Sequence, residues 1–370
     1  MSRRREVRIC HGGMEEAEVR RFEQFLRHVT GFECLLAEEP EAEVAVIDTD
    51  GDLGSYLVRA HRMLYPARPI IHVSAQGSLG RDALSVWARK PVDPAAFGEA
   101  LARALAAATP AGSSDSLVRG RQRRPSALAR DRNAERIANL YVGSMTDIDV
   151  RDAAQRERAS YHPGNYLQGF FESARQFAGE NGTVTALMHR QERILTLSAD
   201  GLRVTTSLDR RSLRSLGLIP LAKQDFRIVS GTPDPDHVWQ PASPLLWELA
   251  LWASRGRIPA GVPFDVPVHL LRWPNLTRLG LTPDAIRIAA LWSGHPTSLV
   301  LSARTLQLPQ RNVFAFFSAC RALGLVRLKA ATEQAPEVPP TAPAPGSAGR
   351  GLFNRILAKL PGLHDGTEHR

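Results

Sequence analysis

Short apolar runs alternate with amphipathic stretches through the first part of the chain, residues 1–108. Because a strand covered on both faces of a parallel sheet is apolar throughout, each of these runs predicts a buried strand. The predicted strands are residues 7–10, 32–37, 43–48, 69–74 and 85–88, and the predicted helices are 14–29, 53–64 and 94–107. This alternation predicts a doubly wound α/β domain, whose functional edge lies at the carboxyl ends of the strands.

The pattern changes in residues 137–245, where one helical stretch is followed by alternating segments. Apolar positions at helical spacing predict a helix over residues 166–177. Asp200-Gly201 separates two alternating runs, which is a strong hairpin signal, and residues 225–230 supply a further strand. We therefore expect an α+β middle domain with a small antiparallel sheet.

Residues 246–329 are expected to form a mainly helical domain. Its predicted elements include helices at 284–292, 297–307 and 310–323 and a closing strand at 325–328. This order resembles a winged helix-turn-helix domain, which implies either DNA binding or a dimerising or docking module. DNA reading would use Gln310, Arg311 and Asn312, because polar side chains at the start of the last helix can reach base edges. The rest of that helix is apolar almost all round, which instead indicates burial or protein contact.

Two segments have the composition of connectors. Residues 109–136 form a linker crowded with arginine, which is either a solvated connector or a patch that binds phosphate groups or acidic protein. Its arginines include Arg121, Arg123 and Arg124. Residues 330–349 are a disordered Pro/Ala tether that leads to an amphipathic helix at 350–363. The apolar face of that helix consists of Leu352, Phe353, Ile356, Leu357 and Leu360. This tail would dock on a protein, lie on a membrane surface or fold back onto the chain.

Composition narrows the classes of protein that remain. The 370 residues suggest two or three domains, and the formal net charge of +9 permits nucleic acid or an anionic membrane as a partner. The three cysteines are far apart in the sequence, so we expect a reduced, cytoplasmic setting. The sequence shows neither a membrane-spanning apolar run nor a signal peptide. It also lacks a phosphate-binding Gly-rich loop and other catalytic motifs, so we expect no enzymatic activity, metal or cofactor.

Polar residues stand at the ends of three predicted strands of the first domain. They are Asp48, Ser74 and Lys90, the last followed by Pro91. An acid, a hydroxyl and a lysine in this order resemble the receiver domain of bacterial response regulators, over roughly residues 5–108. The resemblance implies that the acid is phosphorylated, that the hydroxyl contacts the phosphate and that the lysine pairs with it.

The chain departs from the receiver pattern where the first strand ends. Two acidic residues that hold Mg²⁺ are expected there, whereas this sequence has Cys10-His11-Gly12-Gly13 and no carboxylate before Glu15. Mg²⁺ requires oxygen ligands and usually one or two carboxylates, so Asp48 alone is a poor site. We therefore expect a receiver-like fold that has lost phosphotransfer and binds a partner through its strand ends. The residues expected on this surface are Asp48, Ser74, Lys90, His11 and Asp50.

The tandem of domains loosely resembles bacterial signalling proteins of the PATAN type. We expect a non-enzymatic signalling or scaffold protein with protein partners, a winged-helix-like second contact or homodimer face, and a tail that can hold it peripherally at the inner membrane. One alternative is a transcription regulator that binds DNA through Arg311, Asn312 and the arginine-rich linker. Another is a cyclic di-GMP receptor, because Thr196–Gly201 resembles part of a PilZ loop, although Thr196 and the missing arginine pair depart from that pattern.

Overall fold

The computed structural model describes residues 4–14, 16–76, 82–108, 142–232, 238–280 and 282–329. All of these belong to the first of two compact units, Met1–Lys329 and Ala330–Arg370. Within these ranges, every helix is too short or too polar to traverse a bilayer. The predicted linker and tail lie outside the described residues. They include Arg121, Arg123, Arg124, Leu352, Phe353, Ile356, Leu357 and Leu360.

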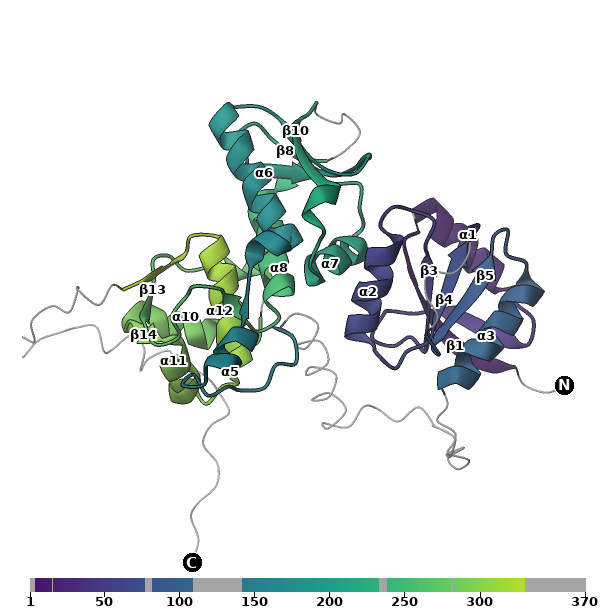
Figure 1. Ribbon diagram of the computed structural model, residues 1–370, viewed down its shortest axis with the longest axis horizontal. Coiled ribbons are helices and arrows are strands. Elements are labelled where there is room, and N and C mark those ends of the chain that lie inside the picture. The colour runs from purple at the N-terminus through teal and green to yellow at the C-terminus, as the bar shows by residue number, and fades with distance from the viewer. Residues whose placement is uncertain are drawn as a thin grey trace, which may run out of the picture. The chain divides into compact units, whose positions relative to one another are not determined.

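Residues 5–108 form a parallel five-stranded sheet with helices on both faces, in the strand order β2-β1-β3-β4-β5 (Figure 1). Its strands are β1 (Arg5–Gly12), β2 (Phe32–Leu36), β3 (Val44–Asp48), β4 (Ile70–Ser74) and β5 (Ser85–Arg89). Its helices are α1 (Glu16–Leu26), α2 (Gly54–Leu64) and α3 (Pro94–Ala108). The predicted doubly wound α/β arrangement is confirmed, and the sheet is compatible with a receiver-like fold.

Both faces of the central strands are covered, which explains their unbroken apolar sequence. Every residue of β4 and all but the last residue of β3 are buried. On the face covered by α1 and α3, the Phe97 ring meets Phe22 and Phe25 edge to face, with ring centroids 6.0 and 5.4 Å apart. On the other face, Leu57 of α2 packs against Ile47. Strand β4 ends at Ser74 and β5 begins at Ser85. The segment between them is therefore shorter than the connections of this sheet that contain α1 or α2.

An antiparallel sheet follows, in the order β10-β7-β8-β9-β11. Its strands are β7 (Thr185–His189), β8 (Glu192–Leu197), β9 (Arg203–Thr205), β10 (Phe226–Ser230) and β11 (Gln240–Pro241), and it packs with α6 (Leu167–Asn181) and α7 (Arg210–Leu218). The predicted hairpin joins β8 to β9. The Gly201 amide donates to the Ser198 carbonyl at 2.8 Å, and its φ of +67° is one that glycine adopts without a steric penalty.

The last part of the unit is mainly helical, with a small sheet in the order β14-β13-β15. Its elements are β13 (Pro267–Leu270), α9 (Leu276–Leu279), α10 (Ala285–Gly294), β14 (Thr297–Ser298), α11 (Leu299–Leu306), α12 (Gln310–Ala322) and β15 (Val326–Leu328). Beside them, α5 (Ala153–Arg158) leads into β6 (Ser160–Tyr161), which pairs with β12 (Ile258–Pro259). Helix α12 runs through the interior, where the Phe316 ring lies 5.9 Å from that of Trp247 and 5.6 Å from that of Trp292.

Helix α8 (Ala242–Ser254) is shared by two hydrophobic cores. Leu246, Leu249 and Trp252 pack into the core of the antiparallel sheet, whereas Trp247 and Leu251 pack into the core around α12. This double burial explains why the helix is apolar on all sides. The domain boundary expected between residues 245 and 246 falls inside this helix.

Candidate functional site

Three strand ends of the parallel sheet bring Asp48, Ser74 and Lys90 together. Because carboxyl ends of parallel strands meet at one edge, residues that follow β3, β4 and β5 become neighbours. The Lys90 ammonium donates to Asp48 Oδ2 at 2.5 Å and lies 3.0 Å from Asp50 Oδ2. The Ser74 hydroxyl donates to Asp50 Oδ1 at 2.6 Å. The peptide bond between Lys90 and Pro91 is cis.

Each carboxylate oxygen of Asp48 and Asp50 already accepts a hydrogen bond. Besides the Lys90 and Ser74 contacts, Asp48 Oδ1 accepts from the Asp50 amide at 3.1 Å, and both oxygens of Asp50 accept from the Ala75 amide at 3.0 and 3.1 Å. The side chains of Asp48 and Asp50 are 13% and 25% exposed. The carboxylate oxygens of this group are therefore all bonded within the protein. We call the group formed by Asp48, Asp50, Ser74 and Lys90 the acid–lysine network.

Hydrogen bonds in the acid–lysine network lower the pKa of Asp50 and raise the pKa of Lys90, and both shifts favour the charged forms. The pKa of the Asp50 carboxyl is lowered, chiefly because the Ser74 hydroxyl bonds the ionised form; burial opposes this shift, and Lys90 adds to it. Burial alone would lower the pKa of the Lys90 ammonium, but its hydrogen bonds to Asp48 and Asp50 outweigh burial and raise it. At neutral pH Asp50 is therefore a carboxylate and Lys90 an ammonium.

The end of β1 contributes no acid to this edge. Gly12 and Gly13 stand there, and a Cβ on Gly13 would lie 2.8 Å from the Asp48 carbonyl oxygen, so the two backbones approach too closely for a larger residue. Within the described ranges, no cluster of three or more His, Cys, Asp or Glu side chains could hold a metal ion. Two carboxylates already bound to an ammonium do not fit Mg²⁺, which prefers octahedral oxygen coordination.

His11, which the sequence places at the same edge, is not part of the acid–lysine network. It lines a separate hollow together with His61, Arg211 and Ser212. Burial is the main cause of the lowered pKa of the His11 imidazole, and the charge of Arg211 adds to it. We therefore expect His11 to be neutral at physiological pH.

A cleft of about 820 Å³ opens beside Asp48, between the parallel sheet and the start of α7. Its lining includes Gly13, Asp48, Leu57, Glu192, Arg193 and Asp209. Tyr56 and Ala60 of α2, and Leu53 just before this helix, hold the walls together because they belong to the same core as α7. The sequence alone predicts neither the cleft nor α7, because nine residues rich in arginine do not by themselves indicate a buried helix.

Polar contacts also join α2 and the β2–β3 loop to the antiparallel part. The Tyr56 hydroxyl donates to Asp225 Oδ2 at 3.2 Å, and Arg190 lies within 3.3 Å of Asp52 and 3.6 Å of Asp225. Further ion pairs link Arg211 to Glu38 at 3.0 Å and Arg214 to Glu39. One face of the parallel-sheet domain is thus occupied by the protein's own antiparallel part.

The structure places the proposed DNA-reading side chains largely in the interior. Gln310 is 8% exposed and its amide group bonds both the carbonyl and the amide of Ile148, at 3.1 and 3.0 Å. Asn312 is 9% exposed and donates to Asp284 at 3.0 Å. Arg311 is half-buried. Two of the three expected base-reading groups are therefore engaged within the fold, which argues against the DNA-reading alternative.

The hairpin that resembles part of a PilZ loop also satisfies its own polar groups. Ser198 donates to Asp200 at 2.5 Å and accepts from the Arg203 amide at 3.0 Å, while the Arg203 guanidinium donates to the Trp239 carbonyl at 3.2 Å. Thr196 is buried at 1% exposure. These contacts account for the motif as a stable hairpin.

Comparison with known proteins adds no assignment. No protein-family model, curated protein or solved structure matches this chain.

Proposed function

We propose that the protein is a non-enzymatic signalling or scaffold protein whose receiver-like domain, residues 5–108, binds protein partners without being phosphorylated. In this proposal the winged-helix-like part, residues 246–329, supplies a second protein contact or a dimer face. The tail localises the assembly, and the partners belong to a bacterial signalling system. The proposal combines the resemblance of the sequence with the arrangement of side chains at the sheet edge.

The acid–lysine network carries this proposal. A phosphoryl group on Asp48 would break the hydrogen bond that Asp48 Oδ2 accepts from the Lys90 ammonium at 2.5 Å. Its negative charge would need a divalent cation, and the described residues at the end of β1 provide glycine where a carboxylate would be required. A network that satisfies its own charges suits a fixed recognition surface better than a phosphorylation switch.

The interior position of α12 supports a protein contact over base reading for the last part of the unit. A helix buried on nearly all sides serves as the core of its domain, so the surfaces left for partners are those of the surrounding elements. Protein partners are also consistent with a chain whose catalytic motifs are missing at the sequence level.

Incubation of the full-length protein with acetyl phosphate and Mg²⁺ tests the proposal, with an active response regulator as the positive control. We expect no phosphoryl group on Asp48 by intact mass. We also expect affinity capture of the wild-type protein from the host to recover protein partners that resist nuclease treatment. A phosphorylated Asp48 would refute the proposal, and so would protein partners that disappear after nuclease treatment.

A further inference from the structure

Three consecutive residues after β13 project from the surface. Leu271 and Trp273 are 47% and 53% exposed, and Trp273 is the most exposed of the six tryptophans. Buried residues flank this protrusion on both sides, Leu270 before it and Pro274 after it. The Leu271 amide donates to the Leu325 carbonyl at 2.8 Å, which fixes the loop beside the start of β15. The fold therefore holds two large apolar side chains in water on a well-anchored loop.

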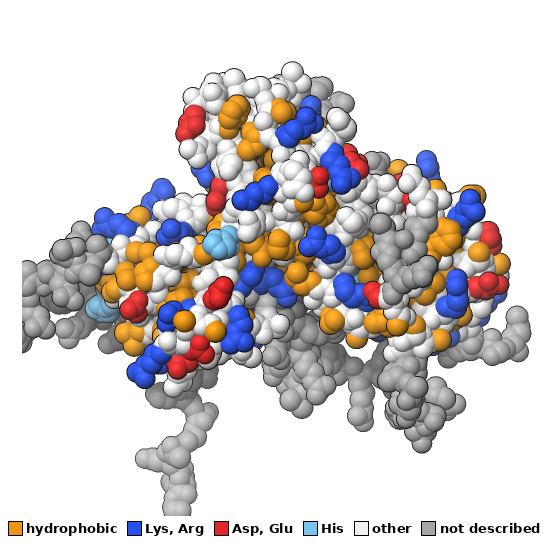
Figure 2. All heavy atoms as spheres, viewed as in Figure 1, with side chains coloured by type: hydrophobic (Ala, Val, Ile, Leu, Met, Phe, Trp, Pro, Cys, Tyr) orange, Lys and Arg blue, Asp and Glu red, His pale blue; other side chains and the backbone are white. Residues whose placement is uncertain are grey.

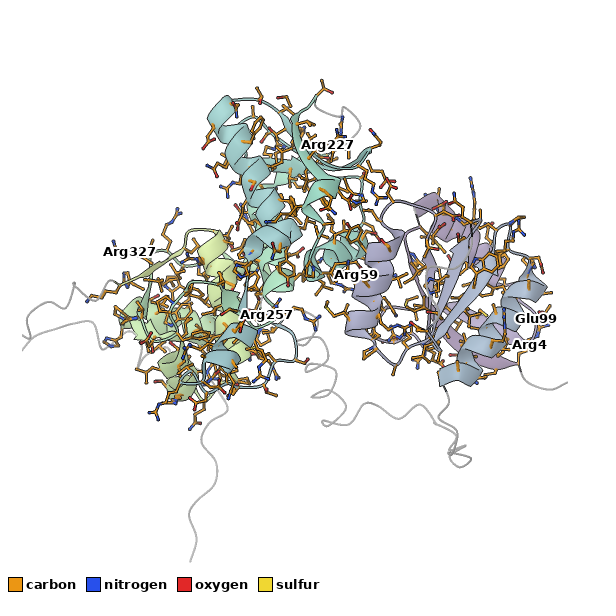
Figure 3. The ribbon with its side chains drawn as sticks, viewed as in Figure 1. Arg4, Arg59, Glu99, Arg227, Arg257 and Arg327 are labelled. Atoms are coloured by element: carbon orange, nitrogen blue, oxygen red, sulfur yellow. The ribbon has the colours of Figure 1, made fainter. Side chains whose placement is uncertain are left out.

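Cations lie in this loop and on the elements that adjoin it. Arg272 and Arg278 follow β13, Arg327 lies on β15, and Lys329 follows β15, where its amide donates to the Pro267 carbonyl at the start of β13. Arg327 faces His269 across the β13–β15 ladder, and Figure 3 shows it on the outer side of the fold. None of these four cations forms an ion pair or a side-chain hydrogen bond with another described residue.

The segments that carry these cations supply no acid of their own. The segments 266–280 and 321–329, which supply β13, the loop, α9 and β15, contain neither Asp nor Glu. On the face seen in Figure 2, apolar side chains lie among Lys, Arg, Asp and Glu side chains over the helical part of the unit. A surface that combines unpaired cations with exposed apolar side chains suits a binding partner that is anionic and also has an apolar region.

We propose that the loop Leu271–Trp273 and the cations around it bind the surface of membranes that contain anionic phospholipid. Tryptophan is favoured at the boundary between headgroups and acyl chains, where Leu271 would enter as well. The four cations would meet the negative headgroups, and each contributes through the surface potential of the membrane. Single-stranded nucleic acid fits this surface less well. Its bases could stack on Trp273 and its phosphates could bind the cations, but Leu271 would stay in water and the loop has a single aromatic ring for stacking.

Flotation of the full-length protein with vesicles tests this proposal. We expect binding to vesicles of phosphatidylcholine mixed with phosphatidylglycerol, weaker binding to phosphatidylcholine alone, and weaker binding as salt is raised. Leu271→Ser combined with Trp273→Ser should weaken binding by about tenfold or more, because two half-exposed apolar side chains no longer enter the bilayer. Arg272→Gln and Arg327→Gln should each weaken it by about fivefold. A vesicle-induced blue shift of tryptophan emission should be lost in Trp273→Phe.

Two matched variants control for general effects of polarity and charge. Leu301→Ser removes a leucine of α11 that is 53% exposed, and Arg103→Gln removes an exposed arginine from α3. Neither should change vesicle binding. Because every variant keeps the natural tail, a difference between them reports on the loop. Binding that is the same for wild type and Leu271→Ser/Trp273→Ser would overturn the proposal. So would tight binding of a fluorescein-labelled oligo(dT) that Trp273→Ser abolishes while vesicle binding persists.

Discussion

Replacing Lys90 with methionine removes the ammonium that joins Asp48 to Asp50 while keeping most of the aliphatic side chain. The ammonium lies 2.5 Å from one carboxylate and 3.0 Å from the other, and the Lys90 side chain is 34% exposed. Removing one partner of a fully buried ion pair costs about 3–5 kcal/mol, whereas an exposed pair contributes about 0.2–1 kcal/mol. This intermediate exposure places the loss of stability for Lys90→Met at about 2 kcal/mol.

Urea unfolding of the full-length protein, followed by circular dichroism, measures this loss. Lys223→Met is the matched control, because Lys223 is exposed and forms no ion pair with another described residue; we expect it to stay within about 0.5 kcal/mol of wild type. Adding Asp48→Asn to Lys90→Met should restore part of the stability, since it removes one of two carboxylates left facing each other.

Two results would refute the reasoning about the acid–lysine network. The first is equal stability of Lys90→Met and Lys223→Met, which would show that the ion pairs contribute nothing measurable. The second is a double variant, Lys90→Met with Asp48→Asn, that is less stable than Lys90→Met alone. That outcome would mean that Asp48 is held by contacts other than the lysine charge.

Three further predictions concern pH, the α2 contact and the α12 core. Because the pKa of Asp50 is lower in the folded protein than in the unfolded chain, ionised Asp50 stabilises the fold fully above about pH 4, and this stabilisation is lost as pH falls through the folded-state pKa. The difference in unfolding free energy between wild type and Lys90→Met, measured in urea, should therefore shrink below about pH 4. Tyr56→Phe removes the bond to Asp225 and should cost about 1 kcal/mol and speed amide exchange in α7. Ser302→Ala leaves the buried Trp292 indole N–H without its partner, which is 2.8 Å away, and should cost about 1–3 kcal/mol in thermal or urea unfolding.

The sequence contains enough information for the parallel sheet because its strands are apolar on both faces. β3 and β4 are buried almost throughout, and this burial produces continuous apolar runs that a residue-by-residue reading can find. The meeting of Asp48, Ser74 and Lys90 then follows from topology alone, because all three residues stand at carboxyl ends of parallel strands. The closed hydrogen-bonding of the two aspartates could not be predicted, since it depends on distances of 2.5–3.1 Å.

Elements that depend on tertiary packing were harder to find. Helix α7 is short and arginine-rich, and it is stabilised by packing its Leu213 and Leu216 against the core that includes Tyr56. Strands of two residues, such as β6 and β14, leave no pattern of alternation to detect. The polar residues at the start of α12 have the composition of a DNA-reading surface, but composition does not say which face of a helix is turned inward. Their burial follows from contacts with Ile148 and Asp284, which are distant in sequence.

Helix α8 has a consequence for how this protein can change over generations. One side of the helix completes the core of the antiparallel sheet and the other completes the core around α12. A recombination point anywhere within residues 242–254 would therefore leave both cores without side chains that they need. Exchange of modules between genes therefore cannot separate these two parts without loss of folding. The parallel-sheet domain has a core of its own and is followed by the long segment between Ala108 and Val142, so an exchange there would disturb only the residues that α2 and its start contribute to the core of α7.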